Sequence, residues 1–115
     1  MSALAARCPV PVTVEVAVAP RPPTAVESTA YFIVAEALTN LAKHSAAQTA
    51  RVSVRRTGNT VTVQVIDDGH GGAALRPGGG LSGLADRAAT IDGVMTVLSP
   101  PGGPTLVTAE LPCEW

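Results

Sequence analysis

The sequence is poor in aromatic residues, in cysteines and in long apolar stretches. Among 115 residues it has one Trp, one Tyr, one Phe and two cysteines. Cys8 and Cys113 lack metal-ligand spacing, and a disulfide framework would need more cysteines, so we expect free thiols, with a bridge between the two as the alternative. The apolar stretch within residues 25–43 is too short and too polar to span a bilayer. Residues 1–6 lack the basic start and apolar run of a signal peptide. These absences favour a cytoplasmic domain without direct membrane contact, whether or not a longer parent protein is membrane-bound.

The charge distribution gives no basis for binding nucleic acid. The formal net charge is −1, and the eight basic residues form no run longer than Arg55-Arg56. With 46% hydrophobic residues, the chain can bury a core of its own. Its length is that of one domain, and we expect residues 1–10 to be a residual linker and residues 11–115 to be the domain.

Alternation of apolar with small or polar residues predicts five strands. A turn at Thr57-Gly58-Asn59 joins two of them into a hairpin. Because such direct strand-to-strand connections dominate, we expect a mixed sheet of about five strands with helices on one face, an α/β two-layer sandwich. The predicted strands are Pro11–Ala19, Ala50–Arg56, Thr60–Ile66, Val94–Leu98 and Thr105–Leu111.

Two helices are predicted from the spacing of apolar residues. Thr24 and Glu27 fit a capping box at the start of the first helix, which then runs to about Lys43 or His44. The second helix covers residues 81–91, and Gly93 lies where a C-terminal cap belongs.

The first helix carries a polar stripe on an otherwise apolar surface. Glu36, Asn40 and His44 are spaced four apart and Lys43 is three past Asn40, so the four share one side of the helix. Such a stripe either meets a polar ligand or metal ion, or is a solvated edge with an incidental Glu–Lys pair; the helix alone does not decide between them. The neighbouring apolar face consists of Ala30, Ile33, Val34, Ala37, Leu38 and Leu41.

Two further groups of residues follow along the chain. Asp67 lies at the end of a predicted strand, where it could accept a hydrogen bond from a ligand amino group. Gly69 and Gly71 let the backbone approach a ligand closely. The alternative is an ordinary tight turn.

The glycine run at residues 78–80 opens directly into a helix, where unobstructed N–H groups suit phosphates. The alternative is a flexible linker. The run is neither a Walker loop nor a Rossmann fingerprint. Together the three groups offer a metal ligand, an amino-group acceptor and a phosphate cradle, which is the equipment of an ATP pocket.

These patterns resemble the N, G1 and G2 boxes of the ATPase superfamily that contains gyrase, Hsp90, histidine kinases and MutL. The resemblance covers about residues 25–112, implies the Bergerat ATP-binding fold, and is closest to nitrate-sensor-like histidine kinases of two-component systems. The matching residues are Glu36-x-x-x-Asn40-x-x-Lys43-His44, Asp67-x-Gly69-x-Gly71, Gly78-x-Gly80-Leu81-x-Gly83-Leu84 and the run Gly83-Leu84-Ala85-Asp86-Arg87.

The resemblance implies a role for each box. Asn40 would ligate the Mg²⁺ that bridges the phosphates, Glu36 would position or activate the reacting group, and Lys43 and His44 would face the phosphates. This assignment is physically reasonable because phosphoryl transfer needs charge neutralisation and placement more than covalent help.

The other two boxes would form the base and phosphate pockets. Asp67 would accept from the adenine amino group, and Thr105 resembles the threonine that supports this aspartate. Gly69 and Gly71 would shape the base pocket. The third box, Gly78, Gly80, Leu81, Gly83 and Leu84, would hold phosphate oxygens.

The sequence departs from the family pattern at three places. Pro104 replaces the glycine usual before Thr105, Asp92-Gly93 replaces a Gly-Gly pair, and only six residues separate Gly71 from Gly78. The family's phosphate-accepting histidine lies on a dimerisation domain, and neither histidine of this chain is placed as an acceptor. We therefore expect a monomer that acts on a separate histidine-bearing domain, with a response regulator downstream. The alternatives are an anti-sigma-type serine kinase, an ATP-gated dimerisation module, and a degenerate pocket that serves as a docking module.

Overall fold

The computed structural model describes residues 6, 10–44, 48–69, 80–100 and 104–113, except for the side chains of residues 42–44 and 80–82. All the predicted helices and strands are confirmed, with ends shifted by at most two residues. In chain order they are β1 (Val12–Ala17), α2 (Thr24–His44), β2 (Ala50–Thr57), β3 (Thr60–Asp67), α3 (Gly80–Ala89), β4 (Val94–Leu98) and β5 (Thr105–Pro112).

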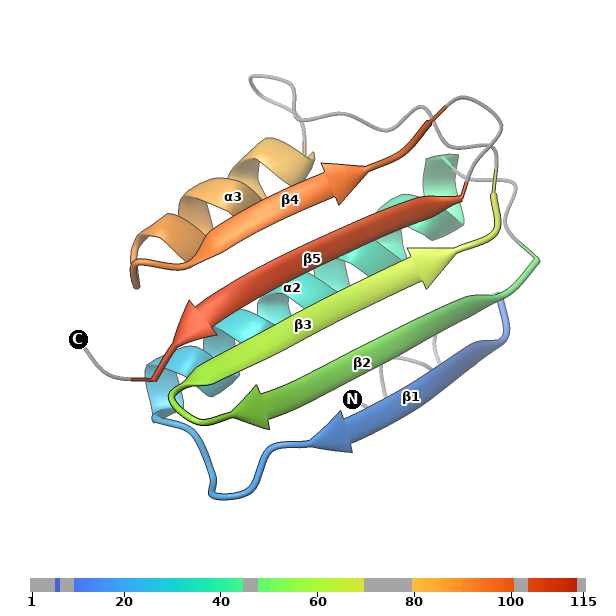
Figure 1. Ribbon diagram of the computed structural model, residues 1–115. Coiled ribbons are helices and arrows are strands. Elements are labelled where there is room, and N and C mark those ends of the chain that lie inside the picture. The colour runs from blue at the N-terminus through green and yellow to red at the C-terminus, as the bar shows by residue number, and fades with distance from the viewer. Residues whose placement is uncertain (1–5, 7–9, 45–47, 70–79, 101–103, 114–115) are drawn as a thin grey trace.

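The strands form one mixed sheet in the order β1-β2-β3-β5-β4. β1 runs parallel to β2, and the remaining neighbours are antiparallel. Helix α2 packs on β3 and β5, and α3 packs on β4 and α2, so both helices lie on the same face of the sheet (Figure 1). The expected two-layer α/β sandwich is confirmed.

The core lies between this face and the helices. Every second residue of the central strands points into it, as the alternation predicts, and the whole predicted apolar face of α2 is buried. The core residues with almost no exposure are Val26, Ile33, Val34, Val52, Val61, Val63, Leu84, Ala88, Ala109 and Leu111. Cys113 is also buried, with a free thiol, and Cys8 lies outside the described residues.

The two ends of the sheet hold different elements, and we call them the site end and the far end. At the site end β3 finishes at Asp67, which faces Ala50 of β2 on one side and Thr105 of β5 on the other. The carboxyl end of α2 lies at this same end (Figure 1). The far end holds the start of α2 and the Gly58-Asn59 turn of the β2–β3 hairpin. Gly58 has φ 61°, as the first central residue of a type II′ hairpin turn requires.

The predicted capping box at the start of α2 is wrong. The backbone N–H groups of Val26 and Glu27 both donate to the carbonyl of Pro23, each at 3.0 Å. The Glu27 carboxylate instead pairs with Arg21, whose Nε lies 2.9 Å from Oε1. A charged partner just before the helix takes the carboxylate away from the position that a capping box requires.

The end of α3 also differs from the prediction. Asp92, with φ 59°, takes the left-handed position, and the N–H of Gly93 donates to the carbonyl of Ala88 at 2.8 Å. This is the Schellman arrangement with Gly93 one residue later than expected. A Cβ at Gly93 would lie 2.7 Å from Leu111 Cδ2 and 2.9 Å from the Ala88 oxygen. Glycine is therefore needed there for space and not for its φ.

Among the described residues, no helix is long and apolar enough to cross a membrane.

Candidate nucleotide-binding site

Helix α2 presents its polar stripe beside the buried face. Glu36 and Asn40 are both half-buried, whereas Ala37 and Leu41 next to them are in the core. The buried neighbours thus orient the stripe along the edge of the core. Lys43 and His44 belong to the last turn of α2, and their side chains lie outside the described part of the chain.

Asp67 is a buried carboxylate at the carboxyl end of β3. It is 6% exposed, and its Oδ1 accepts a hydrogen bond from the N–H of Gly69 at 2.8 Å. This bond closes a tight turn directly after the strand and fixes the carboxylate's direction. A carboxylate has about four lone-pair sites, so the same group can also accept from a ligand amino group.

Thr105 completes this part of the site. It is 9% exposed and faces Asp67 across the β3–β5 pair. Its hydroxyl lies 2.6 Å from the hydroxyl of Ser99, which follows β4. The sequence indicated Thr105 only through the family resemblance and did not indicate its contact with Ser99, since no local pattern connects two residues six positions apart in different segments.

Asp68 makes a set of contacts that the sequence analysis missed. Its carboxylate accepts from the N–H of Gln48 at 2.7 Å, the N–H of Thr49 at 3.0 Å and the Thr49 hydroxyl at 2.9 Å. The N–H of Asp68 donates to the Thr49 carbonyl at 3.3 Å. The backbone N–H of Thr49, followed by that of Gln48 and the Thr49 hydroxyl, holds the pKa of Asp68 below its ordinary value. The hairpin register was the available signal: once Ala50 faces Asp67, Thr49 must lie beside Asp68.

Helix α3 contributes a glycine and a core residue. Gly83 is exposed and a Cβ there would meet no atom within 4 Å, so its surface is open to a ligand. Leu84 has 0% exposure, and its part in a site is to fix α3 against the core. Gly80 and Leu81 form the first turn of α3, and Gly71 and Gly78 lie outside the described residues.

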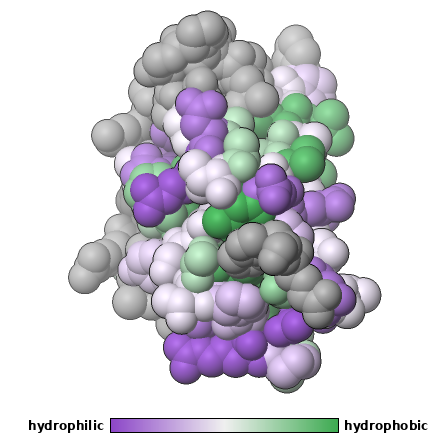
Figure 2. All heavy atoms as spheres, turned by 90° about the vertical axis from the view of Figure 1, so that its left-hand side faces the viewer, coloured by the Kyte–Doolittle hydropathy of each residue, from purple (hydrophilic) through white to green (hydrophobic). Residues whose placement is uncertain are grey.

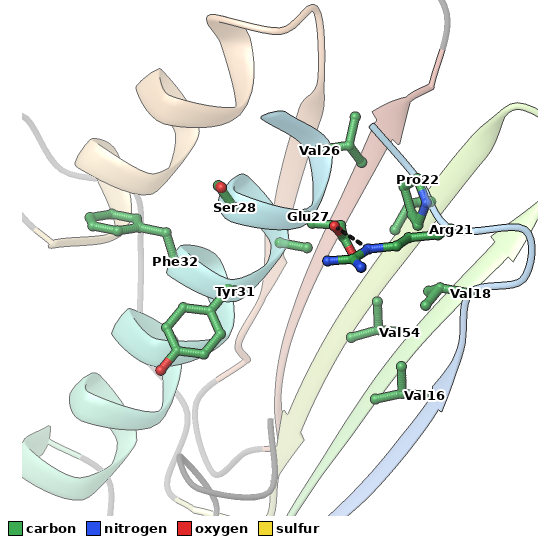
Figure 3. Close-up of a pocket in the computed structure, with 12 residues that line it drawn as sticks. Val16, Val18, Arg21, Pro22, Val26, Glu27, Ser28, Tyr31, Phe32 and Val54 are labelled. Atoms are coloured by element: carbon green, nitrogen blue, oxygen red, sulfur yellow. Dashed lines mark hydrogen bonds and ion pairs between the residues drawn. The ribbon is translucent and has the colours of Figure 1, made fainter. Parts of the chain in front are cut away.

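An apolar pocket of about 460 Å³ lies at the far end of the sheet, between the first half of α2 and strands β1 and β2. Figure 3 shows Tyr31 and Phe32 on its helix side and Val16 and Val54 on its sheet side. Its charged groups, Arg21 and Glu27, pair with each other. Seen from this end, hydrophilic and hydrophobic residues are interspersed on the surface (Figure 2). The pocket lining is apolar apart from Arg21, Glu27, Ser28 and Tyr31, and it contains none of the candidate site residues that the sequence analysis selected.

Comparison with known proteins gives the class. Residues 25–114 match the family described as histidine kinase-, DNA gyrase B- and HSP90-like ATPases. The chain belongs to this family and is an ATP-binding domain of it.

The individual relatives narrow the class. The chain is 39% identical to the sensor histidine kinase NarS of Mycobacterium tuberculosis, over 71% of this chain and 21% of that protein. It is 35% identical to the sensor histidine kinase YxjM of Bacillus subtilis, over 64% of this chain and 18% of that protein. The chain thus spans about a fifth of the length of these relatives. Neither relative favours the serine-kinase alternative.

The solved structures agree on the fold. The histidine kinase domain of the blue-light activated histidine kinase from Erythrobacter litoralis EL346 superposes with a TM-score of 0.73 at 23% identity, covering 97% of this chain and 57% of that one.

Proposed function

We propose that this domain binds Mg-ATP and supplies the γ-phosphate to a histidine on a separate dimerisation domain of a longer sensor kinase, from which a response regulator then takes it. The observation that carries the proposal is the buried Asp67 carboxylate, beside Thr105, at the end of the sheet where α2 brings its polar stripe. Family membership and the sensor histidine kinase relatives support it.

The adenine would bind at Asp67. A buried carboxylate fixed by the Gly69 N–H recognises an exocyclic amino group because the amino group donates where a carbonyl could not. Thr105 would position a water or the base itself, while Gly69 and Gly71 would leave room for the ring. Guanine, with an oxygen in place of that amino group, would be rejected.

The phosphates and the metal would bind between α2 and the start of α3. Asn40 offers an amide oxygen and Glu36 a carboxylate, one helical turn apart and both half-buried. Within the described residues no three His, Cys, Asp or Glu side chains gather as a metal cluster. The Asn40 oxygen suits Mg²⁺, which commonly takes one or two protein oxygens together with phosphate oxygens and water, and this ion would neutralise phosphate charge during transfer. Glu36 would position or activate the reacting group. Lys43 and His44 would face the phosphates, and Gly78, Gly80, Leu81 and Gly83 would surround them, with Leu84 holding the helix.

The proposed function also includes the domain boundaries and the oligomeric state. Residues 11–115 would form the ATPase domain, preceded by a linker at residues 1–10, and the isolated domain would be a monomer in the cytoplasm. Sedimentation at several concentrations would give a constant mass if this is correct.

Calorimetric titration with Mg-ATP and Mg-ADP tests the proposal. We expect saturable one-site binding by the wild type and a loss of about 1–3 kcal/mol, roughly five- to 150-fold in affinity, for Asp67→Asn, because the amide presents a donor to the adenine amino group. Glu110→Gln, an exposed carboxylate on β5 away from the site end, is the matched control and should bind as the wild type does.

Phosphoryl transfer is tested separately with labelled ATP and a histidine-bearing dimerisation domain. An acid-labile label on that domain supports histidine transfer. An acid-stable label on an added anti-anti-sigma protein would instead identify a serine kinase, and the absence of nucleotide binding by folded wild type would refute the proposed function altogether.

A further inference from the structure

The Asp68 carboxylate joins two segments that are distant in sequence. Three donors converge on it, the N–H groups of Gln48 and Thr49 and the Thr49 hydroxyl, all at 2.7–3.0 Å. The return bond from the Asp68 N–H to the Thr49 carbonyl is 3.3 Å. Asp68 is exposed, so a single bond there would compete poorly with water, and the convergence of several donors is what fixes the geometry.

The two joined segments belong to different halves of the proposed nucleotide site. Asp68 directly follows Asp67, the proposed adenine contact, and precedes Gly69, which fixes the Asp67 carboxylate. Gln48 and Thr49 lie in the connection that begins after α2 ends at His44 and leads into β2. Helix α2 carries Asn40 and the other proposed phosphate contacts. Among the described residues, the Asp68 side chain therefore ties the base end of the proposed site to the connection that follows α2.

Backbone pairing alone does not make this tie. The β2–β3 ladder ends with the pair Ala50 and Asp67, and beyond it a single backbone bond, from the Asp68 N–H to the Thr49 carbonyl at 3.3 Å, links the two described segments. The Asp68 side chain, which accepts the N–H groups of Thr49 and Gln48, reinforces this one bond and extends the attachment to Gln48.

We propose that Asp68 is a positioning residue that sets the adenine contact at the correct distance from α2, and so determines the affinity for ligands that span both halves of the site. This inference rests on the proposed nucleotide binding. It differs from a general stabilising role because it predicts selective loss: ligands that reach both halves should be affected, and a ligand confined to the base end should not.

The test compares Mg-ADP with adenosine, each measured by competition against a fluorescent ADP analogue. For Asp68→Ala we expect the affinity for Mg-ADP to fall roughly five- to tenfold and that for adenosine to change less than about twofold, as the loss of three solvent-exposed hydrogen bonds suggests. Glu110→Ala, which removes an exposed carboxylate from β5, is the control and should change neither affinity.

Two milder variants make the test independent of whether Asp68→Ala folds. Thr49→Val keeps both backbone donors and removes only the hydroxyl, and Asp68→Asn keeps one acceptor oxygen for the backbone N–H groups. Both should be folded by circular dichroism and should reduce the Mg-ADP to adenosine affinity ratio by roughly two- to threefold.

The outcomes separate this inference from the function on which it rests. Wild type that binds Mg-ADP, with an unchanged affinity ratio in all three variants, overturns the role of Asp68 and leaves the proposed function intact. Equal losses for Mg-ADP and adenosine also overturn it, because they would show general loosening of the site. Wild type that binds neither ligand overturns both proposals.

Discussion

The two ends of the sheet are each fastened by one charged side chain, but with opposite polarity. At the site end the Asp68 carboxylate accepts from backbone N–H groups of Gln48 and Thr49. At the far end the Arg56 guanidinium donates to backbone carbonyls of Pro20, Arg21 and Gly58, at 3.0, 3.3 and 3.0 Å.

The two side chains differ in the segments that their hydrogen bonds join. Arg56 ties the connection between β1 and α2 to the hairpin turn, and the adjacent charged pair, Arg21 with Glu27, is closed on itself. Asp68 ties together the backbone on either side of the proposed nucleotide site. We therefore assign the hydrogen bonds at the far end to the stability of the fold, and we propose that those at the site end position the nucleotide contacts. Substitutions at the two ends should therefore separate stability from binding.

The largest expected effect is on stability at the far end. Arg56→Ala removes three charge-assisted hydrogen bonds from a half-buried residue and should lower the free energy of unfolding by about 2 kcal/mol, measured by urea denaturation. The affinity of the folded protein for Mg-ADP should stay unchanged. Arg55→Ala is the matched control: its pair with Glu15 is exposed, so it should cost at most about 0.5 kcal/mol. Equal losses for the two arginines would remove the basis of the comparison.

A smaller effect of opposite sign is expected at the site end. Gly83→Ala lies within α3, where a Cβ meets nothing within 4 Å, and should raise the free energy of unfolding by about 0.5–1 kcal/mol through helix propensity. If Gly83 faces the phosphates, the same methyl group should weaken Mg-ADP binding. A variant that is stabilised and binds Mg-ADP unchanged would show that Gly83 does not contact the nucleotide.

The smallest effect is the pH dependence of the Asp68 contacts. Hydrogen bonds from Thr49 and Gln48 hold the pKa of Asp68 below its ordinary value. A carboxylate with a lowered folded-state pKa contributes stability that is fully present above its unfolded-state pKa and is lost as the pH falls through the folded-state pKa. The stability difference between wild type and Asp68→Asn should therefore be constant near neutral pH and shrink in the acid range below the ordinary aspartate pKa. Thermal unfolding at a series of pH values measures it, and a difference that grows on acidification would contradict the assignment.

Prediction from sequence worked best where the signal was periodic. The alternation in Thr60–Asp67 reports burial directly, because successive side chains of a strand point to opposite faces. The buried face of α2 follows from helical spacing for the same reason. Within the site, Asp67 and Asn40 could be selected because each is a polar residue at an unusual place in an apolar element.

Prediction from sequence was weaker for the two helix ends, where contacts with a particular partner decide the local structure. Glu27 fits a capping box with Thr24, yet pairs with Arg21. Gly93 fits a left-handed cap, yet Asp92 takes the positive φ, and Gly93 is required by the closeness of Leu111 and of a backbone oxygen. In both cases the local pattern allowed two arrangements, and contacts with a residue outside that pattern selected one.

The sequence by itself determined the order of helices and strands and the face of each that is buried. It also indicated the family, through the polar stripe of α2, the Asp67 turn and the glycine run at residues 78–80. These properties depend on spacing along one element, which the chain carries locally. Only the tertiary structure decided that Thr105 lies beside Ser99, that Asp68 fastens Thr49, and that Asp67 is at the same end of the sheet as the polar stripe of α2. Those residues belong to different segments of the chain, and only the packing of the sheet against the helices brings the segments close together.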